Sequence, residues 1–110
     1  MSVKIGNIEV GDFPLLLAPM EDVSDPPFRA LCKQNGADIM YTEFISSEGL
    51  IRNAKKSTIK LDIYDFERPI GIQIFGHDIK SMRKATEICE KVLLAAYSCQ
   101  NRLLHLYQQE

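Results

Sequence analysis

The chain has 110 residues, of which 45% are hydrophobic and 25% charged, an ordinary composition for a globular domain. Thirteen Lys and Arg against 15 Asp and Glu give a net charge of −2, which excludes a strongly basic chain but leaves room for a local basic patch. The three cysteines form no C-x-x-C pair and are odd in number, so we expect a reducing, cytoplasmic environment. We expect no signal peptide or membrane span, because no apolar stretch is long enough for one.

The N-terminal part of the chain predicts a hairpin followed by a buried strand. Two β-prone pieces, 3–5 and 8–10, flank Gly6-Asn7, a pair typical of a type II′ turn. Residues 15–18 are apolar without interruption, as expected of a strand buried on both faces of a sheet.

A helix is predicted next. Ser24 can cap its start, Pro26 and Pro27 suit the first turn, and Gly36 is placed to end it. Its apolar side would consist of three residues at helical spacing: Phe28, Leu31 and Cys32.

Two further strand–helix pairs follow, and then a tail. The strands are predicted at 39–44 and 70–76, and the helices at 46–56 and from Asp78 to 92. Alternating strands and helices favour a parallel sheet wrapped by helices, either a (β/α)8 barrel or a doubly wound sheet. Residues 93–110 contain helix formers with neither Gly nor Pro, so we expect a helical tail and no further strand.

Ligands of parallel α/β proteins bind at the C-terminal ends of the strands, which directs attention to Met20, Glu43 and Gln73. The Met20 thioether could lie beneath a planar ring, and the Gln73 amide could both donate to and accept from a heteroaromatic edge. Glu43 could accept hydrogen bonds or pair with Arg29. The plainer alternatives are a core methionine, a satisfied buried amide and a structural ion pair.

Two other groups of residues bear on binding. The basic segment 52–56 is the best candidate for contact with phosphate, although such a run is more commonly a solvated helix end. No His, Cys or acidic residues have the spacing of metal ligands, so we expect no metal.

Three segments in order are similar to a known family. They read "LLLAPMEDVSDPPFRALCKQNGAD", "YTEFISSEGL" and "ERPIGIQIFGHD". Together with "IGNIEV" before them, they resemble the opening third of the tRNA-dihydrouridine synthases, most closely the bacterial B-type branch, over residues 3–92.

The resemblance implies an FMN enzyme on a TIM barrel with an added helical domain, which uses NADPH to reduce a uridine of tRNA to 5,6-dihydrouridine. By position, Ala18, Pro19, Met20 and Gln73 match flavin-contacting residues, and Glu43 lies toward the substrate side of the pocket. The family's acid is a cysteine in an Asn-x-Gly-Cys-Pro segment, which is absent here. Cys99 lacks that context, so no catalytic residue is assigned.

The same resemblance divides the chain into a partial FMN-binding barrel domain, 1–92, and a non-matching tail, 93–110. Since a complete barrel takes about 250 residues, we expect at most three strand–helix units here. We expect a truncated or frameshifted gene product that alone binds FMN weakly and lacks activity. Two alternatives stay open: another FMN-dependent barrel oxidoreductase, and a non-enzymatic remnant or interaction module.

Overall fold

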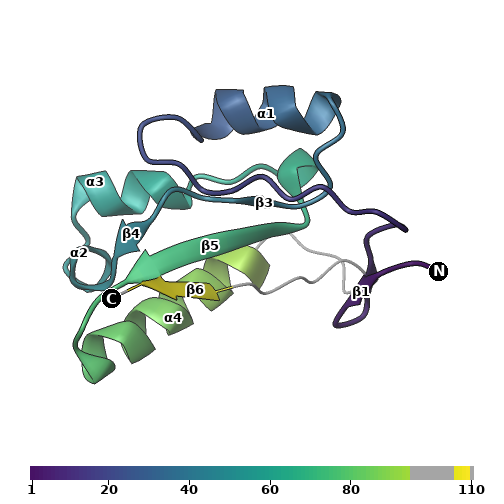
Figure 1. The fold of residues 1–110 in the computed structure, drawn as a ribbon. Helices are drawn as coiled ribbons and strands as arrows, with labels where there is room; N and C mark the ends of the chain where they lie inside the picture. The colour runs from purple at the N-terminus through teal and green to yellow at the C-terminus, as the bar shows by residue number, and fades with distance from the viewer. Residues whose placement is uncertain (95–105, 110) are drawn as a thin grey trace.

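The computed structural model describes residues 1–94 and 106–109, with side chains for the first of these ranges. The described part of the chain is an α/β structure with a parallel sheet, helices packed along it and an N-terminal hairpin at one end (Figure 1). None of its described helices combines the length and the apolar character that a membrane span requires.

The hairpin forms as predicted. Strands β1 (Lys4–Ile5) and β2 (Ile8–Glu9) pair antiparallel, and Gly6 between them has φ of 59°. A type II′ turn requires a positive φ at its first central position, where glycine carries no steric cost. Ile5 and Ile8 then pack on a small buried cluster, which consists of Val10, Ile39 and Tyr41.

The sheet is built in chain order around β5 (Ile70–Phe75). Strands β3 (Met40–Tyr41) and β4 (Ile45–Ser46) both pair parallel with one edge of β5. On the other edge, β6 (Leu106–Gln109) also runs parallel to β5. β6 corrects the prediction of a helical tail without a strand: residues 106–109 add a fourth parallel strand segment, because β5 offers a free edge of unpaired backbone groups.

β3 and β4 are one strand interrupted by a bulge, where the sequence predicts an unbroken strand over 39–44. Tyr41 lies opposite Gly71 and Ile45 opposite Ile74, so three residues on this strand span two on β5. The extra residue reverses the alternation of side chains between the two faces. Ile45 consequently faces the helix-covered core, whereas Ile39 and Tyr41 face the hairpin.

The first predicted strand, 15–18, is wrong in its extent and burial. It is reduced to an isolated parallel bridge between Leu16 and Ile39. Leu15 is 51% and Leu16 50% exposed, because this segment pairs along one side only among the residues that the structure describes.

The first helix, α1 (Pro26–Gln34), ends where the sequence predicts, with Gly36 at φ 105°. Its start differs: the Asp25 side chain, rather than that of Ser24, accepts from the backbone N–H of Phe28. The predicted apolar side is wrong at Leu31, which is 56% exposed, whereas Phe28 and Cys32 are half-buried. The buried residue of α1 is Arg29 instead.

A buried ion pair anchors α1. The Arg29 guanidinium donates to both carboxylate oxygens of Glu67, at 3.0 and 3.3 Å, and to the backbone carbonyl of Ser24 at 2.7 Å. Glu67 belongs to the short 3-10 helix η2 (Asp65–Glu67) and is fully buried. The sequence suggests Glu43 as the partner of Arg29, and this suggestion is wrong.

The segment predicted as one helix over 46–56 is broken in two. Ser46 caps α2 (Ser47–Ile51) as predicted, through the N–H of Gly49. Asn53 then adopts φ of 57°, a left-handed conformation that ends a helix, and α3 (Lys55–Thr58) starts in a new direction. A 3-10 turn, η1 (Ile59–Leu61), continues from α3.

The long helix α4 (Ile79–Leu94) covers one face of β5, below the sheet in Figure 1. Asp78 caps it as predicted, accepting from the N–H and hydroxyl of Ser81. These hydrogen bonds lower the pKa of the Asp78 carboxyl. The main core forms between the two elements and α2, and its buried members are Ile45, Leu50, Ile70, Ile72, Ile74, Met82, Ala85, Cys89 and Leu93.

We predict that Glu67→Gln lowers the free energy of unfolding by about 3–5 kcal/mol, because it leaves the Arg29 charge buried without compensation. Urea unfolding followed by circular dichroism measures this loss. Glu48→Gln is the matched control, since it breaks the exposed pair of Glu48 and Arg52 and should cost at most about 0.5 kcal/mol. Equal losses in the two variants would contradict the anchoring role of the buried pair.

Candidate functional site

The loop after the first strand is a tight turn held by the side chain of Ser24. The hydroxyl of this buried serine accepts from the Met20 N–H at 2.8 Å and donates to the Met20 carbonyl at 3.0 Å. The Ser24 N–H donates to the same carbonyl at 2.9 Å. Because Arg29 binds the Ser24 carbonyl, the buried ion pair also fixes this turn.

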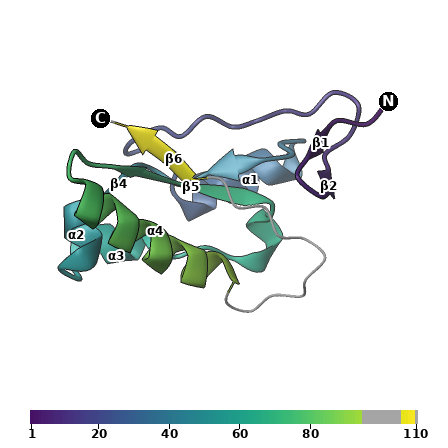
Figure 2. The same cartoon turned by 90° about the horizontal axis from the view of Figure 1, so that it is seen from below.

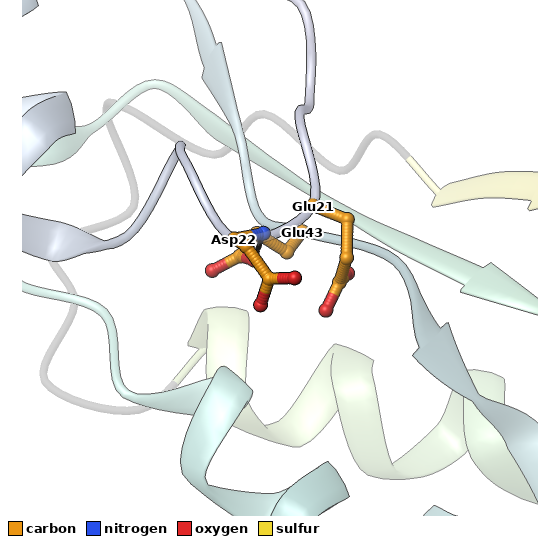
Figure 3. Close-up of side chains that lie close together, drawn as sticks. All are labelled: Glu21, Asp22 and Glu43. Carbon is orange, nitrogen blue, oxygen red and sulfur yellow. Dashed lines mark hydrogen bonds between the residues drawn. The ribbon is translucent and has the colours of Figure 1, made fainter.

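Glu43 connects the second strand to that turn. Its carboxylate accepts the backbone N–H of Asp22, which has φ of 62°. Figure 3 shows the side chains of Glu21, Asp22 and Glu43 gathered at this point. Their carboxylate oxygens lie within 4.8 Å of one another, although all three residues are at least partly exposed.

Thr42, the residue before Glu43, makes the corresponding connection to β5. Its hydroxyl accepts the backbone N–H of Gln73 at 3.2 Å, and its own N–H donates to the Gly71 carbonyl at 2.9 Å. At the bulge, the Thr42 hydroxyl thus replaces the backbone carbonyl that would accept the Gln73 N–H in a regular strand pair. Thr42 and Glu43 together tie the first and third strands to the second at one level of the sheet.

The predicted flavin-contacting residues lie on these connected segments. Ala18 and Met20 are exposed and Pro19 is half-buried, while Gln73 is buried in the middle of β5. Ile72 and Ile74 face α4, so Gln73 between them faces the opposite side of the sheet. Through the intervening threonine and glutamate, the structure links the Met20 turn to the backbone of Gln73.

An acidic pocket of about 250 Å³ opens beside the turn. Lys60 reaches into its border, donating to the Glu21 carboxylate at 2.8 Å and to the Phe44 carbonyl at 3.1 Å. This grouping was not predicted from the sequence. The signal for it was the shared position of the acidic residues after neighbouring parallel strands. The residues that line the pocket are Glu21, Asp22, Asp25, Pro26, Arg29, Glu43, Ile59, Lys60 and Asp62.

A second pocket, of about 270 Å³, lies at the C-terminal ends of β4 and β5. Ser46, Ser47 and Glu48 line it from one side, and 75–77 from the other. The Ser47 hydroxyl is buried without a hydrogen-bond partner among the described residues.

The described cysteines do not supply a proton donor at these strand ends. Burial raises the pKa of the Cys89 thiol to about 12, and its side chain packs in the α4 core. Cys32 lies half-buried on α1. Cys99 lies outside the described residues.

Comparisons with known proteins give a consistent result. The family model described as "Dihydrouridine synthase (Dus)" matches residues 16–96. A probable tRNA-dihydrouridine synthase of Aquifex aeolicus is 40% identical over 80 residues, which cover 72% of this chain and 25% of that protein. The tRNA-dihydrouridine synthase B of Pseudomonas syringae is 37% identical over 84 residues, or 76% of this chain and 25% of that protein.

The chain therefore spans about a quarter of the length of these curated relatives. A probable tRNA-dihydrouridine synthase of Rickettsia prowazekii, 35% identical over 89 residues, is covered to a similar degree, 27%. No solved structure gives a significant match to this chain.

We predict that Thr42→Val, which is nearly isosteric, destabilises the chain by about 1–3 kcal/mol, because the Gln73 N–H is left buried without an acceptor. Hydrogen exchange followed by NMR should show faster exchange of the Gln73 amide. Thr42→Ser keeps the hydroxyl and should preserve slow exchange at that amide. Equally slow exchange in the valine and serine variants would show that the hydroxyl does not hold β5.

Proposed function

Because the chain belongs to the dihydrouridine synthase family, we propose that residues 1–92 form the opening part of an FMN-dependent barrel that reduces uridine in tRNA to 5,6-dihydrouridine. NADPH would reduce the flavin, and a tRNA substrate would place the protein in the cytoplasm. The observation that best supports this proposal is the family match over 16–96, which contains Met20, Glu43 and Gln73 at the strand ends.

The order of the strands supports a barrel rather than a doubly wound sheet. Leu16 bridges to the second strand, the second pairs with β5, and β5 pairs with β6, always parallel and in chain order. A doubly wound sheet reverses its order at a switch point, whereas a barrel adds each strand beside the one before it. No reversal occurs among the described strands.

The residues proposed to hold the flavin are Ala18, Pro19, Met20 and Gln73. Gln73 is 3% exposed, and its side chain lies on the sheet face away from α4, which corresponds to the interior of a barrel. Such an amide offers a donor and an acceptor in a dry environment, which suits the mixed edge of a flavin ring. Met20 is 37% exposed on a turn whose backbone is fixed at both polar atoms.

The chain's own residues would position the cofactor and substrate rather than transfer the proton. Reduced FMN, when bound, supplies the hydride for the uracil ring. Glu43 is proposed to lie toward the substrate side, where its carboxylate also holds the Asp22 backbone. We assign no described residue as the acid.

A chimera tests the proposal. Residues 1–92 replace the corresponding quarter of the tRNA-dihydrouridine synthase B of Pseudomonas syringae, in cells that lack dihydrouridine synthases. We expect a yellow protein and dihydrouridine in tRNA, detected by mass spectrometry. A colourless, folded chimera would contradict the proposed flavin site. The 110-residue chain alone should bind FMN weakly in a fluorescence titration.

In the chimera, Gln73→Leu should weaken FMN binding about tenfold, because the amide's hydrogen bonds to the ring are lost. Gln34→Leu is the matched control, since Gln34 is exposed on α1. Isothermal titration of the flavin-free proteins measures both affinities. Equal FMN affinity in the two variants would remove Gln73 from the site.

A further inference from the structure

Two exposed segments outside the proposed flavin site are strongly basic. One lies at the end of α2 and the start of α3, and the other on the first turns of α4. On α4 the basic positions have the i, i+3, i+4 spacing of a single helix face. We call these side chains the basic surface; its members are Arg52, Lys55, Lys56, Lys80, Arg83 and Lys84, all exposed.

The two segments lie side by side. α2 packs against α4 and α3 against α2, and both views place α2, α3 and the start of α4 at the same end of the molecule (Figures 1 and 2). α2 follows β4 directly, and α4 follows β5 after a short loop. The basic surface therefore borders the C-terminal ends of these strands, the edge at which the proposed reaction takes place.

Little negative charge offsets this surface. The segments 48–56 and 78–84 contain two carboxylates, those of Glu48 and Asp78, and the exposed Glu87 follows one turn further along α4. Glu48 lies 3.4 Å from Arg52, and Asp78 is engaged in capping α4. The two segments thus carry four net positive charges in a chain whose net charge is −2.

The charge of the molecule is consequently segregated. The acidic pocket groups Glu21, Asp22 and Glu43 beside the turn after the first strand, whereas the basic surface lies beyond the second and third strands. A polyanion approaching the strand ends would be repelled at the first site and attracted at the second.

We propose that the basic surface binds the phosphate backbone of the tRNA whose uridine is reduced, an inference that rests on the proposed function. Exposed Lys and Arg side chains neutralise phosphates and release condensed counterions, which supplies affinity without reading sequence. The basic surface would bind the part of the RNA that flanks the reacting nucleotide, next to the C-terminal ends of β4 and β5. An acidic protein partner is the alternative that the experiment must separate.

The test measures binding of the intact chain to a fluorescent, unmodified tRNA transcript by anisotropy over a range of salt concentrations. If all six side chains contact phosphates, the slope of log K against log salt should be about −5. Lys80→Gln with Lys84→Gln should reduce its magnitude by about 2, and so should Lys55→Gln with Lys56→Gln.

Lys4→Gln with Lys91→Gln is the control, because it removes the same charge from the hairpin and from the far end of α4. The proposal is overturned if this control changes the slope as much as the surface variants do, or if the chain does not bind tRNA. Tighter binding to a polyglutamate peptide than to tRNA would also overturn it, in favour of an acidic partner.

The readout involves neither flavin nor turnover, so it separates the two proposals. If the salt slope is the same in the surface variants as in the unsubstituted chain while the chimera is active, the basic surface does not bind tRNA and the proposed function stands. If the chimera is inactive while tRNA binding depends on the basic surface, the surface stands and the proposed function is contradicted. Only variants whose circular dichroism spectra match that of the unsubstituted chain are folded as it is, and only these are compared.

Discussion

The one-residue bulge in the second strand is the constraint on which the rest of the sheet depends. Simple alternation would place residues 39, 41, 43 and 45 on one face. The extra residue instead lets Ile39 and Tyr41 cover the hairpin cluster while Ile45 joins the core beneath α4. At the bulge, the side chain of Thr42 holds the backbone of β5, and the side chain of Glu43 holds that of the Met20 turn.

The second organising interaction is electrostatic. α1 is attached through Arg29 rather than through the apolar stripe expected from its sequence, and the same guanidinium binds the carbonyl of Ser24. Ser24 in turn holds both backbone polar groups of Met20. One buried charge pair thereby sets the position of a helix and the shape of the loop proposed to meet the flavin. Loss of this ion pair would disturb the proposed cofactor site without any change in the side chains that form it.

Much of this could be predicted from the sequence, where local signals were strong. Gly6-Asn7 specified the hairpin turn, the β-branched run specified β5, and Asp78 specified the start of α4. The bulge, the Arg29–Glu67 pair and β6 could not, since each depends on contacts between segments distant in sequence. The spacing of apolar residues also predicted the wrong buried residue on α1. A helix that buries a paired guanidinium, here that of Arg29, can leave a leucine such as Leu31 in solvent. The resemblance indicated the strand ends, but not how Thr42 and Glu43 connect them.

The exposed first strand has a consequence for how the polypeptide behaves in solution. In a parallel ladder the backbone groups of Leu15 and Leu17 bond the second strand, so those of Leu16 point outward, and no described residue receives them. Phe13, two residues before Leu15 in the sequence, is 86% exposed. Unpaired backbone N–H and C=O groups beside exposed apolar side chains can pair with another extended peptide, which then adds a strand to the sheet. Preparations at high concentration would accordingly tend to self-associate through this exposed strand edge until a complementary strand caps it.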